Sequence, residues 1–191
     1  MKTTLLKTLL PWLCYAVLSF LGWHKSAAPV ALLVLTLSCL ILGTGFKPVD
    51  LVLIVYFSAV ALGVGLLHWS WLSSIQPVAA PAMLAIMALV TLLLRQPFTL
   101  PYARESVKDP AMWDNPHFYR VNYILSVLWG SAFLLAALGQ AWALYQPKML
   151  WFVTLSAFLV TGLVGWTTYW FPPWYRKRFY TPELAQSELI E

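Results

Sequence analysis

Charged residues are scarce in this sequence. Asp, Glu, Lys and Arg make up 10% of its 191 residues, and hydrophobic residues make up 61%. About 25% of the residues in a typical soluble domain are charged. A water-facing fold of this size has no interior large enough for so much apolar surface, so we infer that lipid is its main solvent. The sequence therefore predicts a single integral membrane domain over residues 1–191.

Cysteine and catalytic motifs are also scarce. The only two cysteines, Cys14 and Cys39, lie inside apolar segments. They are too few for a disulfide framework and lack the spacing of a metal site. The sequence contains no nucleophile elbow, P-loop, zinc-protease motif, dithiol motif or dinucleotide fingerprint. These absences favour a non-enzymatic protein, for which we expect no cofactor.

Long apolar segments fill most of the chain. A spanning helix needs roughly 20 apolar residues, and the sequence predicts an all-α membrane bundle of six such helices. We expect the sixth helix to end before Pro172 and Pro173, because proline lacks the backbone N–H that a helix uses. Pro11 shortens the first helix and leaves open whether it spans fully. The predicted spans are residues 5–23, 27–45, 48–68, 76–94, 118–143 and 148–170.

The basic residues set the predicted orientation. With six spans, both termini lie on one side of the membrane, and ten of the 12 Lys and Arg residues fall on that side. Only Lys25 and Lys148 fall on the other. This bias predicts cytoplasmic termini, a cytoplasmic loop over residues 95–120 and a cytoplasmic tail over 171–191. It also attributes the net charge of +5 to membrane topology and not to nucleic-acid binding. The ten are Lys2, Lys7, Lys47, Arg95, Arg104, Lys108, Arg120, Arg176, Lys177 and Arg178.

The loop over residues 95–120 is the longest polar interval before the tail. Asn115 and Pro116 are a suitable cap and first residue for the following helix. Basic and aromatic side chains alternate in the loop, which is typical of a segment on an anionic membrane surface. Two interpretations stay open: a solvated connector, or a surface that binds lipid headgroups or a partner. The candidate binding residues are Arg95, Arg104, Lys108, Trp113, His117 and Arg120.

Catalysis in this loop would depend on His117. A histidine base needs a nucleophile and an orienting acid, and nothing in the spacing of the loop carboxylates fixes either partner. His24 and His68 are weak candidates for a metal or haem site, because both are expected at the outer face without nearby carboxylates or thiolates. Ordinary interfacial positions are the favoured interpretation of these two histidines.

No ionisable residue lies in the middle of a predicted span, which argues against a proton-driven pump. Asp50 is the nearest acid. It is expected to stabilise the start of the third span, with Lys47 close by. Polar residues that could line a cavity are Asn122, Ser126 and Gln140, although hydrogen bonds between helices are the alternative. The small pairs Ser126/Gly130 and Thr161/Gly165 predict close helix contacts.

Several local features recur together in one family. They are Leu10-Pro11 in a short first span, Arg95-Gln96-Pro97 at the start of the loop, Trp113 within it, and Asn122 ahead of the segment LSVLWGSAFLLAALGQAWAL. This layout resembles the intracellular septation protein A family of bacterial inner-membrane proteins over most of the chain. The segment PFTLPYARESVKDP is richer in aromatic residues and proline than the family's loop, so a sister family is the alternative.

The resemblance implies an inner-membrane protein that maintains the cell envelope or septum through envelope or division partners, without an established catalytic site. Two other functions stay open from the residues themselves. One is a small permease or lipid-handling protein, because six helices can enclose a cavity. The other is a redox subunit that binds haem or quinone through His24 and His68.

Overall fold

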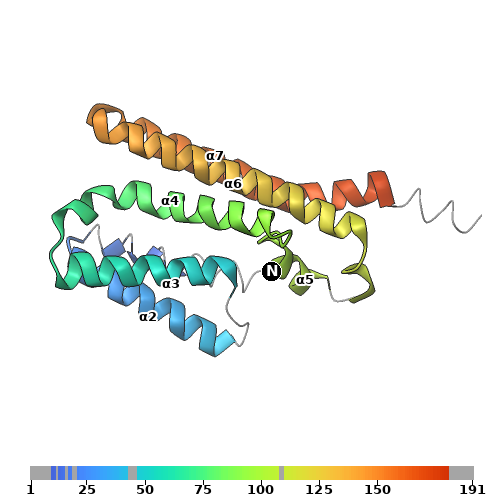
Figure 1. The fold of residues 1–191 in the computed structure, drawn as a ribbon, viewed down its shortest axis with the longest axis horizontal. Coiled ribbons are helices and arrows are strands. Elements are labelled where there is room, and N and C mark those ends of the chain that lie inside the picture. Colours follow the sequence, from blue (N-terminus) through green and yellow to red (C-terminus); the bar gives the residue numbers. More distant parts are fainter. Residues whose placement is uncertain are drawn as a thin grey trace, which may run out of the picture.

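The computed structural model describes residues 10–11, 13–15, 17–18, 21–42, 47–107 and 110–180. Within these residues the chain is helical and forms no strand, as predicted (Figure 1). The elements are α2 His24–Leu42, α3 Pro48–Val60, the π-helical turn η1 Ala61–Leu66, α4 Ser70–Leu93, α5 Leu100–Ser106, η2 Pro110–Met112, α6 Pro116–Tyr145, η3 Pro147–Met149, α7 Leu150–Tyr175 and the π-helical turn η4 Arg176–Tyr180.

Four helical stretches are long and apolar enough to cross a membrane. They are Pro48–Leu66, Ser70–Leu93, Pro116–Tyr145 and Pro147–Phe179, and a shorter apolar helix covers Ala27–Ile41. This confirms the predicted all-helical class, and the four long apolar stretches are compatible with a helical membrane bundle. The count of six spans stays a prediction, because residues 5–9, 12, 16, 19 and 20 of the first segment lie outside the described residues and the second segment is short.

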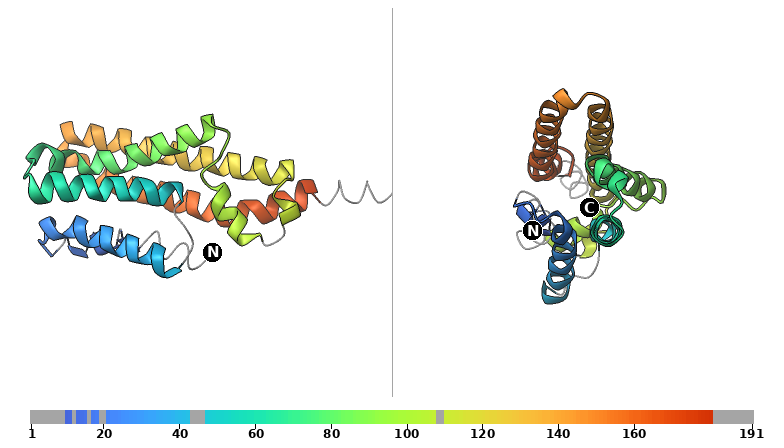
Figure 2. Two further views of the ribbon diagram at one scale, coloured as in Figure 1. Left: turned by 60° about the horizontal axis from the view of Figure 1, so that its bottom comes forward. Right: turned by 90° about the vertical axis from the view of Figure 1, so that its left-hand side faces the viewer.

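The helices pack as neighbours in an open bundle. α6 packs against both α4 and α7, and α3 packs against both α2 and α4. In the end-on view of Figure 2, α6 and α7 form a pair on one side of α4, and α3 and α2 follow on the other side. Leu35 of α2 and Phe57 of α3 are fully buried in the main apolar core.

The outer surface is strongly apolar. On α7, Trp151 is 86% exposed, and Phe158, Leu163 and Tyr169 are also exposed. Because α7 packs mainly against α6, most of its apolar surface has no protein neighbour among the described residues. Such a large exposed apolar area is unusual for a soluble monomer and fits a lipid-facing helix.

Proline does not end the last helix where the sequence predicted. The expectation that the last span ends before Pro172 and Pro173 is wrong, because α7 continues through both to Tyr175. α4 passes through Pro77 and Pro81, which the predicted span of residues 76–94 also contains, but it starts earlier, at Ser70. Each proline removes one helical hydrogen bond, a loss that helices in membrane proteins tolerate when the flanking turns continue.

Small residues behave differently on α6 and α7. A Cβ atom added at Gly130 would lie 3.1 Å from the Cβ of Ala88, so this glycine lets α6 approach α4 closely. A Cβ atom at Gly165 would have no neighbour within 4 Å. The Ser126/Gly130 contact is therefore confirmed. The contact predicted for Thr161/Gly165 is wrong at Gly165, because that glycine faces away from the bundle.

Candidate membrane-contact surface at the loop end of the bundle

The loop after α4 begins with a left-handed turn at Arg95. Its φ of 56° is a conformation that glycine adopts more readily than other residues. The Arg95 N–H donates to the Leu92 carbonyl at 3.0 Å and the Gln96 N–H donates to the Thr91 carbonyl at 2.8 Å. These bonds form a Schellman cap, and Pro97 follows and prevents the helix from continuing. The Arg95 side chain is exposed.

Thr99 fixes the next part of the loop to α6. Its buried hydroxyl donates to the Asn122 carbonyl at 2.9 Å and lies 3.0 Å from the hydroxyl of Ser126. The side-chain amide of Asn122 donates to the Phe118 carbonyl at 2.8 Å. Asn122 and Ser126, the predicted cavity residues, are therefore buried where the loop meets α6. Their role in lining a cavity stays a prediction.

A buried ionic cluster joins the loop to the start of α3. Lys47 is 5% exposed and Asp50 is 1% exposed. The Lys47 backbone N–H donates to an Asp50 carboxylate oxygen at 3.0 Å, which confirms the predicted helix-start role of Asp50. The Lys47 ammonium pairs with the Glu105 carboxylate of α5 at 2.5 Å and lies 4.4 Å from the centre of the Tyr102 ring.

The phenol of Tyr102 in this cluster has a raised pKa. Burial raises the pKa of its phenol, and the neighbouring carboxylates of Asp50 and Glu105 raise it further. A phenolate there would be desolvated and would face two negative charges. The neutral Tyr102 ring contributes an aromatic face to the Lys47 ammonium.

The Trp113 side chain packs against other residues of the same loop. Its indole N–H donates to the Val107 carbonyl at 2.9 Å, and the Arg104 guanidinium lies 5.6 Å from its ring centre. The ring is half-buried within the loop and Arg104 is exposed. Lys108, another predicted binding residue, lies outside the described residues.

His117 connects the start of α6 to the end of α7. Its backbone N–H donates to the Asn115 side chain at 2.9 Å, which confirms the predicted cap. Its ring Nδ1 lies 3.4 Å from the Tyr175 hydroxyl. Tyr175 in turn packs against Phe171 and Phe179 with ring centres 5.6 and 4.7 Å away. These partners place His117 in an aromatic cluster between two helices.

A metal site finds no support in the described part of the chain. No group of three His, Cys, Asp or Glu side chains there is arranged to hold an ion. The His68 side chain is exposed at the turn after η1, and the His24 side chain lies outside the described residues.

Gln140, the third predicted cavity residue, is buried on α6. Its side-chain amide donates to the Thr154 hydroxyl at 3.2 Å, which links α6 to α7.

The cations gather at one end of the bundle. Arg95 follows α4, Arg104 is on α5, Arg120 is in the first turns of α6, and η4 continues from the end of α7. Figure 1 shows these four places together at the same end. Exposed aromatic side chains, among them Trp174 and Phe179, lie beside them. We call this surface the basic end; its exposed cations are Arg95, Arg104, Arg120, Arg176, Lys177 and Arg178.

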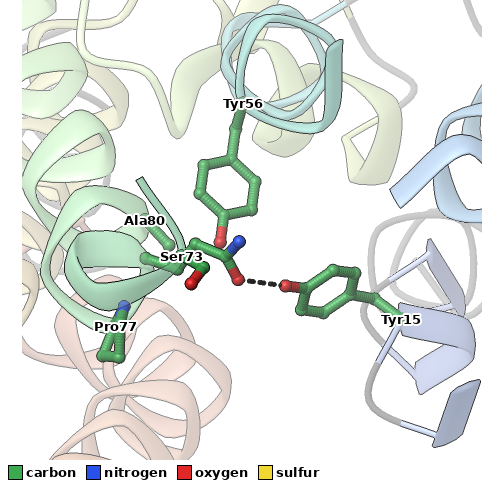
Figure 3. Close-up of a pocket in the computed structure, with 6 residues that line it drawn as sticks. Tyr15, Tyr56, Ser73, Pro77 and Ala80 are labelled. Atoms are coloured by element: carbon green, nitrogen blue, oxygen red, sulfur yellow. Dashed lines mark hydrogen bonds between the residues drawn. The ribbon is translucent and has the colours of Figure 1, made fainter. Parts of the chain in front are cut away.

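A hollow lined by both polar and apolar groups lies nearer the opposite end. The Tyr15 hydroxyl donates to the Gln76 side-chain oxygen at 2.5 Å. The rings of Tyr15 and Tyr56 point toward the α4 residues Ser73, Pro77 and Ala80 (Figure 3). We call this site the tyrosine hollow; its volume is about 310 Å³ and its lining residues are Tyr15, Tyr56, Ser73, Gln76, Pro77 and Ala80.

The sequence did not reveal the partners that shape these two sites. In the sequence Lys47 is a neighbour of Asp50, whereas its pairing with Glu105 joins segments far apart in the chain. Tyr15 and Gln76 are 61 positions apart, so no local spacing could have paired them. The chain matches no protein-family model, no curated protein and no solved structure.

Proposed function

We propose that this chain is a multi-pass bacterial inner-membrane protein that acts by contact and not by catalysis, and that its basic end binds anionic lipid headgroups and a membrane partner. The observation that carries the proposal is the convergence of exposed Arg and Lys side chains with exposed aromatic rings at one end of an apolar bundle. Cations near an anionic leaflet gain about 1 kcal/mol each, and Trp rings favour the interface.

The internal contacts of the loop support this role. The pairing of Lys47 with Glu105 and the hydrogen bonds of Thr99 attach the loop to α3 and α6. An anchored loop loses less conformational entropy on binding than a free one. Arg104 and Arg120 are therefore presented on a rigid frame, as a recognition surface requires.

The proposed topology has six spans with both termini and the basic end in the cytoplasm. The positive-inside rule favours this side for the basic end. Reporter fusions active only in the periplasm should be silent when placed at the C-terminus and active when inserted in the turn at 146–147. A C-terminal fusion with periplasmic activity would overturn the orientation.

Lipid binding is tested by removing cations from the basic end and, as a control, one cation from the opposite end. We expect the variant Arg95→Ala, Arg104→Ala, Arg120→Ala in nanodiscs to lose at least about tenfold in affinity for phosphatidylglycerol over phosphatidylcholine, measured by native mass spectrometry. Arg120→Ala should reproduce part of the loss. Lys148→Ala, an exposed cation in η3 at the other end, is the matched control and should show none. Equal loss in both single variants would contradict the proposal.

A role at the septum or envelope rests on the resemblance to the septation protein A family. It requires a membrane partner that the basic end recognises. Cross-linking in cells should capture a division or envelope protein with the native chain and lose it with the triple variant, while Lys148→Ala retains it. Capture that is unchanged in the triple variant would remove the basic end as the partner surface.

A further inference from the structure

The tyrosine hollow combines hydrogen-bonding groups with an apolar setting. Gln76 accepts the Tyr15 hydroxyl through its side-chain oxygen, which directs its amide –NH₂ away from that bond. Among the described residues, the structure gives this –NH₂ group no acceptor. The amide therefore offers a donor to a ligand oxygen.

The backbone of α4 supplies an acceptor at the same place. Pro77 lies inside the helix and has no N–H to donate to the carbonyl of Ser73, one turn earlier. Ser73 and Pro77 both line the hollow. A carbonyl without its helical donor is unfavourable at membrane depth, so an ordered water that donates both to it and to a ligand oxygen would be stabilised.

The lining defines the charge and shape of the ligand. None of the six lining residues is Asp, Glu, Lys, Arg or His, so a charged ligand would be desolvated without a counter-ion. The rings of Tyr15 and Phe57 have centres 5.6 Å apart, and the ring of Tyr56 lies 5.3 Å from that of Phe57. An aromatic cluster of this kind favours a flat ring as its neighbour.

The size and position of the hollow limit the ligand further. A volume of about 310 Å³ is at the small end of ligand sites and suits one ring head, not a whole lipid. The hollow lies on the first turns of α4, and Gln76 is about 28 Å along that helix from Arg95 at a rise of about 1.5 Å per residue. It is therefore separate from the basic end.

We propose that the tyrosine hollow binds the ring head of a membrane-soluble quinone, with the Gln76 amide donating to a quinone carbonyl and the Tyr15 and Tyr56 rings flanking the head. The apolar tail would extend into the surrounding lipid. The site uses neither His24 nor His68, and the proposal concerns binding and includes no electron transfer. It goes beyond the proposed contact function of the basic end.

Calorimetric titration of the detergent-solubilised full chain with a decyl-substituted benzoquinone tests the proposal. We expect saturable binding to one site. Gln76→Ala should weaken it about tenfold, because losing a hydrogen bond worth about 1–1.5 kcal/mol changes affinity by that factor. Tyr56→Phe keeps the ring and should weaken binding less than Gln76→Ala. Gln140→Ala removes a glutamine outside the hollow and should leave binding unchanged.

Three results would overturn the proposal. They are no saturable binding by the native chain, binding by Gln76→Ala equal to that of Gln140→Ala, and binding of decanol or a diacylglycerol as tight as that of the quinone. The third would assign the hollow to lipid hydroxyl or ester groups. Circular dichroism and elution volume identify a variant that fails to fold, and Gln76→Leu, which keeps most of the side-chain volume without the amide, then carries the comparison. The triple arginine variant should bind quinone normally, which separates this test from that of the basic end.

Discussion

The Lys47 ammonium at the start of α3 pairs with the Glu105 carboxylate of α5, 2.5 Å away. The Lys47 side chain is 6% exposed and the Glu105 side chain is 32% exposed. One charge is thus buried while its partner reaches water. A buried cation depends on its counter-ion more than an exposed one, so this pair holds the loop against the bundle.

Loss of the Glu105 carboxylate should therefore destabilise the protein. We expect Glu105→Gln to lower the free energy of unfolding by about 2 kcal/mol, less than the 3–5 kcal/mol of a fully buried pair because Glu105 is partly exposed. Thermal unfolding in detergent should show a Tm lower by about 4–8 °C. The control is Asp114→Asn, an exposed carboxylate of the same loop, which should leave the Tm unchanged. A double-mutant cycle with Lys47→Met that gives no coupling would refute the ion pair.

Alkaline pH should loosen the same cluster through Tyr102. The pKa of its phenol is raised above the ordinary value of 10.0, first by burial and then by Asp50 and Glu105. The folded chain keeps this proton at a pH where the unfolded chain has lost it. The contribution to stability is thus complete below about pH 10 and falls as the pH rises further. Tm measured from about pH 8 to about pH 11 should fall more steeply for the native protein than for Tyr102→Phe. Parallel curves would contradict this assignment.

Local chemistry accounts for what could be predicted of the fold. Helix starts at Pro48 and Pro116 followed from the proline and cap preferences of a first turn, and the structure has both. The apolar segments predicted the helical class because segment length and hydropathy are properties of the sequence itself. The predicted end of the last helix before Pro172 was wrong, since α7 continues as a helix through Pro172 and Pro173 to Tyr175.

The candidate sites depend on contacts that no local pattern encodes. The Lys47–Glu105 pair and the Tyr15–Gln76 bond both join distant segments, and the positions of these four residues depend on how whole helices pack. The predicted loop surface was partly recognisable, because exposed cations and aromatic residues are dense there. Its anchoring through Thr99 was not, since a lone threonine carries no signal of its partner.

The turn at Arg95 offers a way to separate charge from backbone strain. A non-glycine residue at φ 56° carries a penalty of about 1 kcal/mol. Arg95→Gly should therefore raise the Tm by about 2–4 °C although it removes a cation. Arg95→Ala removes the same charge and keeps the strain, so its Tm should not rise. If both variants change the Tm equally, the side chain and not the turn determines stability here.

Close approach of α4 and α6 should make Gly130 intolerant of even one added carbon. A Cβ atom there would lie 3.1 Å from the Cβ of Ala88, which is 0% exposed and is attached directly to the α4 backbone. The two helices must separate by a few tenths of an ångström, and overpacking of this kind costs about 1–3 kcal/mol. We expect Gly130→Ala to lower the Tm in detergent. Gly162→Ala is the matched control on α7, where an added Cβ has no neighbour within 4 Å, and the higher helix propensity of alanine should leave its Tm unchanged or slightly raised. A Tm of Gly130→Ala equal to that of Gly162→Ala would mean that the α4–α6 contact adapts freely, and the tight packing of these helices would then be wrong.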